Sequence, residues 1–188
     1  MKLSDGEKLI LVMLSELCQK LKTGNEDDAK LVQEAIYSGN LWGLEWAFPG
    51  IFHDSEPTEE MLHTTVDILD MWSFLERGHE ALSPADKGRV GKEASSIGVK
   101  FRGFDGNNEA AYISIARFLI EELDRFQQFD GRDLNSHAPY LGAYARMLTV
   151  FLPLRTTLGS SDLNANQIIS ILKEAIHPEG RKAVGTKA

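Results

Sequence analysis

The chain has 188 residues, 43% hydrophobic and 26% charged, so it is long enough and apolar enough to bury a sizeable core. Twenty basic and 28 acidic side chains give a formal net charge of -8, which disfavours binding to a polyphosphate backbone. The single cysteine, Cys18, excludes an intramolecular disulfide and a cysteine-based zinc site. The first apolar run, Leu9 to Leu14, is too short to cross a membrane, and we expect a cytoplasmic protein.

The first predicted helix covers residues 5–22 and begins at a capping box formed by Ser4 and Glu7. Its apolar residues recur at spacings of three and four and form a single face: Leu9, Ile10, Met13, Leu14, Leu17 and Leu21. A second helix is capped by Asn25 and ends near Gly39. The stretch 40–52 then concentrates aromatic residues (Trp42, Trp46, Phe48 and Phe52), which we assign to the core, with a partner surface as the alternative.

The middle of the chain contains the longest apolar helical pattern. Pro57 suits the first turn of a helix whose apolar face runs from Met61 to Leu75. Ser83 and Pro84 form another helix start, but Gly88 and Gly91 weaken the helix after them, so residues 85–98 are predicted as a loose helix or an ordered loop.

A short extended segment is predicted near residues 99–104, followed by the Asp105-Gly106 turn and a long amphipathic helix from Asn107 to about Gln128. The next helix should start at Ser136 or His137 and fail around Pro153. The last one is capped by Asn164 and ended by Pro178. These elements predict an all-α fold, with one domain of about seven helices over residues 1–177 and a disordered tail over 178–188.

The loop 132–137 holds the strongest catalytic candidate. Arg132 and His137 lie five residues apart, with Asp133 placed to orient the histidine, and this spacing resembles the signature of HEPN-type helical ribonucleases. A histidine can exchange the proton of a 2′-hydroxyl or leaving group, and an arginine can stabilise charge on the phosphate. The structural alternative has Arg132 and Asp133 bonding the loop backbone, with Ser136 or His137 capping a helix.

A second candidate consists of His63, Asp67 and Asp70, whose spacings of four and three place them on one helix face as weak candidates for a divalent metal site. A solvated His–Asp pair is the alternative, and we expect neither a metal nor a cofactor. The common phosphate-binding and zincin motifs do not occur in the sequence. A third group, Glu109, Glu121, Glu122 and Asp124, is expected to face water.

Five blocks of the sequence together resemble the bacterial YfbU family: residues 8–11, 66–72, 101–109, 117–119 and 163–169. The block Gly103-Phe104-Asp105 followed by Glu109 is the most specific of them. The resemblance implies a small, cytosolic, largely helical bacterial protein, and it implies no particular reaction. Some similar sequences carry a short ribbon-helix-helix-like DNA-binding segment, which we do not expect here because the chain begins directly at the Ser4 cap.

These observations favour a non-catalytic interaction or regulatory protein whose partner is itself, as a homo-oligomer, or another protein. No membrane contact is expected. The alternative function is a metal-independent ribonuclease that uses Arg132 and His137, and nucleic acid is a partner only under that alternative.

Overall fold

The computed structural model describes residues 2–52, 57–94, 98–159 and 161–176. These residues form eight α-helices, one π-helical turn, one 3-10 turn and no strand, so the fold is all-α as predicted. The contacts group the chain into two compact units, Met1–Glu56 and Pro57–Ala188, and each is described by itself. A single domain over 1–177 therefore stays a prediction, and the tail 178–188 lies outside the described residues.

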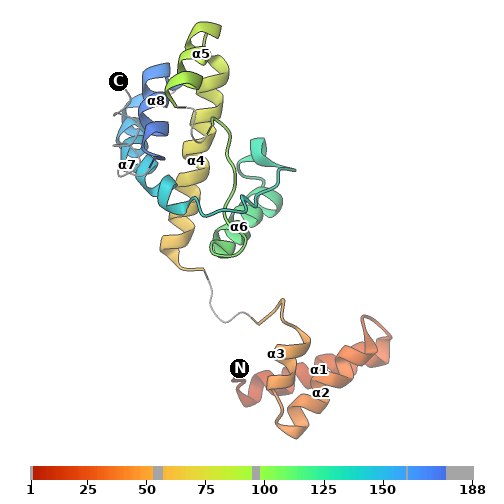
Figure 1. The fold of residues 1–188 in the computed structure, drawn as a ribbon. Coiled ribbons are helices and arrows are strands. Elements are labelled where there is room, and N and C mark those ends of the chain that lie inside the picture. Colours follow the sequence, from red (N-terminus) through yellow and green to blue (C-terminus); the bar gives the residue numbers. More distant parts are fainter. Residues whose placement is uncertain (1, 53–56, 95–97, 160, 177–188) are drawn as a thin grey trace. The chain divides into compact units, whose positions relative to one another are not determined.

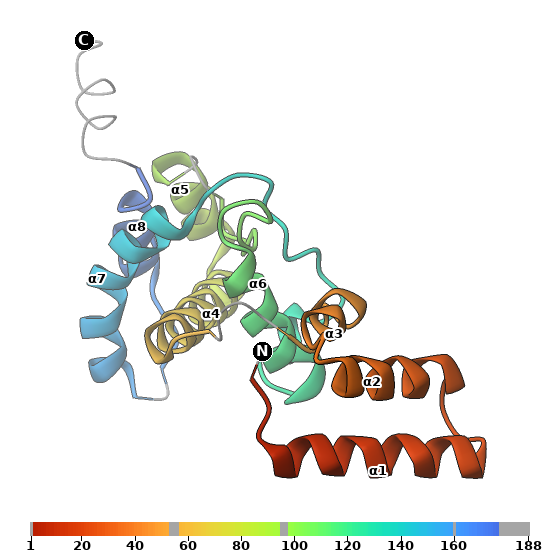
Figure 2. The ribbon, with the colours of Figure 1, turned by 90° about the horizontal axis from the view of Figure 1, so that it is seen from below.

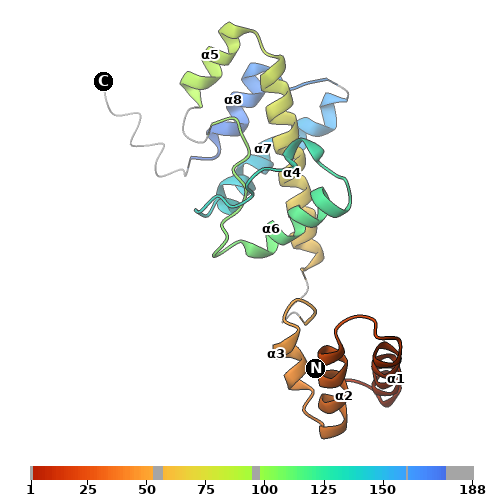
Figure 3. The ribbon, with the colours of Figure 1, turned by 90° about the vertical axis from the view of Figure 1, so that its right-hand side faces the viewer.

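The first unit contains three helices, α1 (Asp5–Leu21), α2 (Glu26–Ser38) and α3 (Trp42–Ala47). The predicted capping box is present, because Glu7 N donates to Ser4 Oγ at 3.3 Å and Ser4 N donates to Glu7 Oε2 at 2.7 Å. α1 and α2 run side by side as an antiparallel pair, and α2 lies between α1 and α3 (Figures 2 and 3). The unit is thin, and few of its described side chains are buried: Val12, Ser15, Ala29, Ala35 and Leu44.

The second unit is organised around α4 (Glu59–Ala81), whose apolar face is completely buried along its middle. α4 contacts α6, α7 and α8, with α7 and α8 on one side and α6 on the other (Figure 1). Thr58 Oγ1 accepts from Met61 N at 3.2 Å and is the N-cap, so Pro57 precedes the cap instead of occupying the first turn. A threonine side chain can satisfy a free amide of the helix end, which a proline ring cannot do.

Two shorter helices, α5 (Pro84–Glu93) and α8 (Ala165–Lys173), pack against each other. Ser83 caps α5, with Pro84 in its first turn, so residues 85–93 of the segment predicted as a loose helix or an ordered loop form a helix despite its two glycines. Residues 95–97 lie outside the described residues. α8 begins at the predicted capping box of Asn164 and Gln167 but ends at Lys173, before Pro178.

The prediction of one long regular helix over residues 107–128 is wrong, both in where the helix starts and ends and in its being regular throughout. It begins later, as α6 (Ala110–Arg117), continues as a π-helical turn (Phe118–Glu122), and is followed by a separate 3-10 turn (Gln127–Phe129). Asp124 and Phe126 both have left-handed backbone angles, with φ of 51°, which breaks the helical path. The free carbonyl of Ile120 is satisfied by Gln127 Nε2 at 2.6 Å, so the helix can stop without leaving that group unpaired.

The segment predicted as extended near 99–104 lies on the core but is not a regular strand, because residues 99–100 bend and Gly103 has a φ of +86°. We keep the name extended segment for residues 99–104. Phe104 pairs with the loop 134–136 through one parallel bridge, in which Phe104 N donates to Leu134 O and Ser136 N donates to Phe104 O, both at 2.9 Å. Buried backbone N–H and C=O groups need hydrogen-bond partners. These two bonds supply partners for the backbone of Phe104, which has no neighbouring strand among the described residues. The rings of Phe101 and Phe104 pack against Trp72 and Tyr144 in the aromatic centre of the core.

The next helix, α7 (Leu141–Leu158), starts later than predicted, with Tyr140 as its N-cap. Neither Ser136 nor His137 begins it: Ser136 N pairs with Phe104 O in the bridge, and His137 has a left-handed φ of 54°. α7 also continues through Pro153, where the predicted break is wrong. Phe151 is fully buried and Leu154 packs on the core, and this burial outweighs the one lost backbone hydrogen bond. No helix within the described ranges is both long and apolar enough to cross a bilayer.

Gly103 provides a direct test of the bridge. Its φ is +86°, and a Cβ atom there would lie 2.0 Å from Leu134 O, so Gly103→Ala combines backbone strain with a backbone clash. We expect it to lower the free energy of unfolding by roughly 3–5 kcal/mol in urea denaturation followed by circular dichroism. Gly131→Ala is the matched control, because φ is +68° with nothing within 4 Å, and it should cost only about 1 kcal/mol. Equal losses would contradict the close approach.

Candidate functional site

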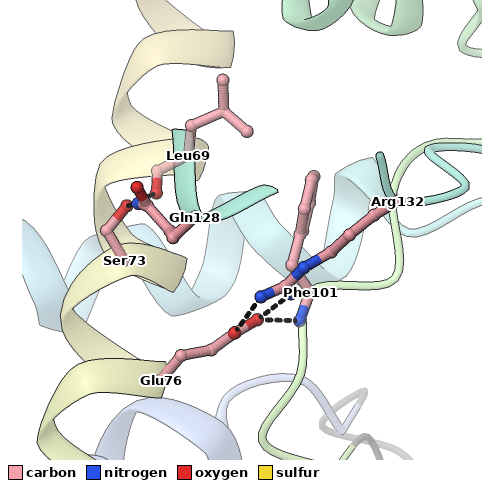
Figure 4. A network of polar contacts seen from close by, with 6 residues as sticks. All are labelled: Leu69, Ser73, Glu76, Phe101, Gln128 and Arg132. Atoms are coloured by element: carbon pink, nitrogen blue, oxygen red, sulfur yellow. Dashed lines mark hydrogen bonds and ion pairs between the residues drawn. The ribbon is translucent and has the colours of Figure 1, made fainter. Parts of the chain in front are cut away.

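Arg132, the predicted catalytic arginine, binds the carboxylate of Glu76 on α4. Its Nη1 and Nη2 donate to Glu76 Oε1 and Oε2, each at 2.8 Å, and Glu76 Oε1 also accepts from Phe101 N at 2.8 Å (Figure 4). The guanidinium lies 5.0 Å from the centre of the Phe129 ring. This two-bond pair with a carboxylate is the strongest geometry available to an arginine.

The pair raises the pKa of Arg132, because hydrogen bonds from Glu76 favour the charged guanidinium more than partial burial disfavours it. Only 17% of the Glu76 side chain and 33% of the Arg132 side chain are exposed. An arginine in this position joins α4 to the loop that follows the 3-10 turn. To reach a substrate phosphate, its guanidinium would have to exchange Glu76 for the phosphate oxygens.

His137 occupies a different environment, on the exposed part of the same loop. Its backbone has a left-handed φ of 54°, its N donates to Asn135 Oδ1 at 3.0 Å, and 76% of its side chain is exposed. Its Nε2 lies 3.9 Å from Asp133 Oδ2, which is too far for a hydrogen bond, so the orienting role of Asp133 stays a prediction. Arg132 and His137 thus pair with different carboxylates, and their joint catalytic role stays a prediction.

The weak metal candidates are separated by their own partners. His63 Nε2 lies 3.5 Å from Glu59 Oε1, whereas Asp67 and Asp70 both face Arg155, at 3.7 Å from its Nη1 and 2.7 Å from its Nε. Burial raises the pKa of Asp70, and Arg155 opposes that rise. Within the ranges that the structure describes, no three histidine, cysteine or acidic side chains are grouped to hold a metal ion.

Glu109 is the acidic residue that sequence reasoning placed wrongly. It is 5% exposed instead of facing water, and its two oxygens accept from Asp105 N at 2.9 Å and from Leu141 N at 2.8 Å. The neighbouring Asp105 is also buried and binds Asn107 N and the Asn108 side chain, which lowers the pKa of Asp105. These bonds explain the Asp105-x-x-x-Glu109 spacing: the acids satisfy the backbone where the extended segment, α6 and α7 meet.

The described residues of the second unit line several surface hollows, three of which concern charged side chains. One of about 520 Å³ is bounded by α6 and the π-helical turn, with Arg117, Glu121 and Glu122 among its lining residues. Two others, of about 530 and 350 Å³, both include Glu76 and Arg132. In these two hollows, Glu76 and Arg132 already pair with each other. The two hollows therefore offer a ligand less unpaired charge than their residue types alone suggest.

The first unit carries the largest departure from ordinary packing. The apolar face predicted on α1 is exposed: Leu9 61%, Ile10 58%, Met13 61%, Leu14 51%, Leu17 50% and Leu21 61%. α1 instead buries Val12 and Ser15, and Gln19 bonds Gln33 on α2. At about 100° per residue, that buried side lies roughly 170° from the apolar face.

The tryptophans of α3 are exposed as well, Trp42 by 58% and Trp46 by 80%, with their rings 5.5 Å apart. The assignment of these two residues to the core is therefore wrong, and a partner surface stays a prediction. Soluble monomers seldom expose contiguous apolar areas of this kind unless the area binds something. We call the six exposed apolar residues of α1, from Leu9 to Leu21, the α1 stripe.

Comparison with known families supports the resemblance seen in the sequence. The family model described as the YfbU domain matches residues 1–173. The match includes both units, and thus covers the α1 stripe as well as the buried Asp105–Glu109 block.

Breaking the Glu76–Arg132 pair should lower the stability of the fold by a measurable amount. Glu76→Gln replaces one acceptor oxygen by an amide donor and removes the charge opposite Arg132, which should lower the free energy of unfolding by about 2–4 kcal/mol in urea denaturation. Glu80→Gln, one turn further along α4 at an exposed position, is the matched control and should change it by less than about 0.5 kcal/mol. Similar values for both variants would show that the pair contributes little.

Proposed function

The chain belongs to the YfbU family, and we propose that it acts in the cytoplasm as a non-catalytic interaction protein whose partner binds the first unit. The α1 stripe is the observation that carries this proposal. Six large apolar side chains, each at least half exposed, lie on one side of one helix. Leaving such a face in water forfeits about 25 cal/mol per Å² of apolar area, so a partner that covers it gains binding free energy.

The packing of the second unit supports the same conclusion. Arg132, Asp67 and Asp70 are paired with Glu76 or Arg155, and Glu109 is used by the backbone. These four charged groups, which the sequence offered as candidates for chemistry or for a water-facing surface, thus have partners within the fold. The first unit has the opposite character, with apolar surface and little burial.

Site-specific photo-crosslinking in living cells tests the interaction role. A diazirine-bearing amino acid is introduced in place of Leu14, and the control carries it in place of Leu123, which is equally exposed at 50% but lies in the second unit. Ultraviolet light should produce a covalent protein adduct from position 14 and at least tenfold less from position 123. Absence of an adduct from position 14, or equal adducts from both positions, would contradict the proposal.

A second candidate function, the metal-independent ribonuclease, is favoured by one observation: His137 is exposed with Asp133 beside it. This function predicts cleavage of mixed single-stranded RNA in EDTA, with a loss of about 10²–10⁴-fold in His137→Ala. His63→Ala is the matched control, since His63 is also exposed and also lies four residues from a carboxylate partner. Activity that survives His137→Ala, or no activity in the folded wild type, would exclude the ribonuclease.

A further inference from the structure

We infer that the α1 stripe binds a second copy of this chain, with the two α1 helices antiparallel across a twofold axis. This inference rests on the proposed interaction role and names its partner. Three features of the stripe suit this partner: the spacing of its residues, its area, and the charges at its ends.

The spacing suits helix–helix packing. Ile10, Leu14, Leu17 and Leu21 follow one another at intervals of four, three and four residues, which is the seam of a two-stranded coiled coil. Leu9 and Met13 widen this seam on one side. A partner with the same spacing places its side chains between these residues as knobs into holes, and another copy of α1 has that spacing by definition.

The area suits a dimer. The stripe offers on the order of 500 Å² of apolar surface. Two copies facing one another therefore bury on the order of 1,000 Å², and the polar residues at the rim bring the total toward the roughly 1,200 Å² of small specific interfaces. The first unit buries few of its own side chains, so pairing would also supply part of the core that it lacks.

The end charges select the antiparallel arrangement. The first turn of α1 carries Asp5 and Glu7, and the last turn carries Lys20. Antiparallel helices bring the acidic turn of one copy toward the basic turn of the other, whereas parallel helices bring like charges together. The helix dipoles favour the same choice, because the positive end of each helix then lies beside the negative end of its neighbour.

The first experiment measures the mass of the purified full-length chain by light scattering at micromolar concentration. We expect twice the chain mass of 20.9 kDa. The double variant Leu14→Glu with Leu17→Glu should return the mass to that of one chain, with its helical circular dichroism retained because both positions are exposed. Leu123→Glu, at matched exposure in the second unit, should remain dimeric.

The second experiment tests the direction of pairing in a Cys18→Ser background. Chains with Ile10→Cys and differently sized chains with Leu21→Cys are mixed and oxidised. Antiparallel helices place these two positions opposite one another, so the mixture should form a disulfide between the two chain types, and Leu21→Cys alone should form at least tenfold less. The reverse pattern would overturn the antiparallel arrangement.

Failure of this inference can be told apart from failure of the proposed function. A wild-type chain of 20.9 kDa that still gives an adduct with a different protein from position 14 overturns the second copy as partner, while the interaction role stands. A wild-type chain of that mass with no adduct from position 14 overturns both.

Discussion

The carboxylate of Glu76 is the interaction on which the second unit depends most. It projects from the buried middle of α4 and binds both the backbone of Phe101 and the guanidinium of Arg132. One side chain thereby holds the extended segment and the 132–137 loop against the central helix. A partly buried charge of this kind is tolerated because both of its oxygens accept hydrogen bonds.

Glu109 makes a comparable connection at the other end of the extended segment. Its carboxylate binds the backbone of Asp105 and the first residue of α7, so that segment, α6 and α7 meet at one buried acid. The two glutamates act on irregular backbone, where regular helices supply no hydrogen bonds. Glu109, which the sequence led us to expect at the surface, and Glu76 are both used to pair backbone groups.

The first unit differs from the second in what it leaves exposed. Its helices hydrogen-bond their own backbone groups, but the apolar side chains of α1 stay in contact with water. α1 packs on α2 through Val12, Ser15 and Gln19 and leaves the α1 stripe in water. Removing such an apolar face from water is favourable, so any partner that covers it gains binding free energy. The second unit is thus closed by internal polar pairs, whereas the first unit keeps an apolar helix face exposed.

Local patterns determined the parts of this protein that depend on neighbouring residues. The caps at Ser4, Asn25, Ser83 and Asn164, the all-α class and the apolar periodicity of α1 and α4 were all readable, because caps and periodicity act over three or four positions. Only the tertiary structure decided which apolar face is buried, where the helix after Asn107 breaks, and which carboxylate each arginine meets. Those outcomes depend on groups distant in sequence: Glu76 and Arg132 are 56 positions apart, and Glu109 and Leu141 are 32.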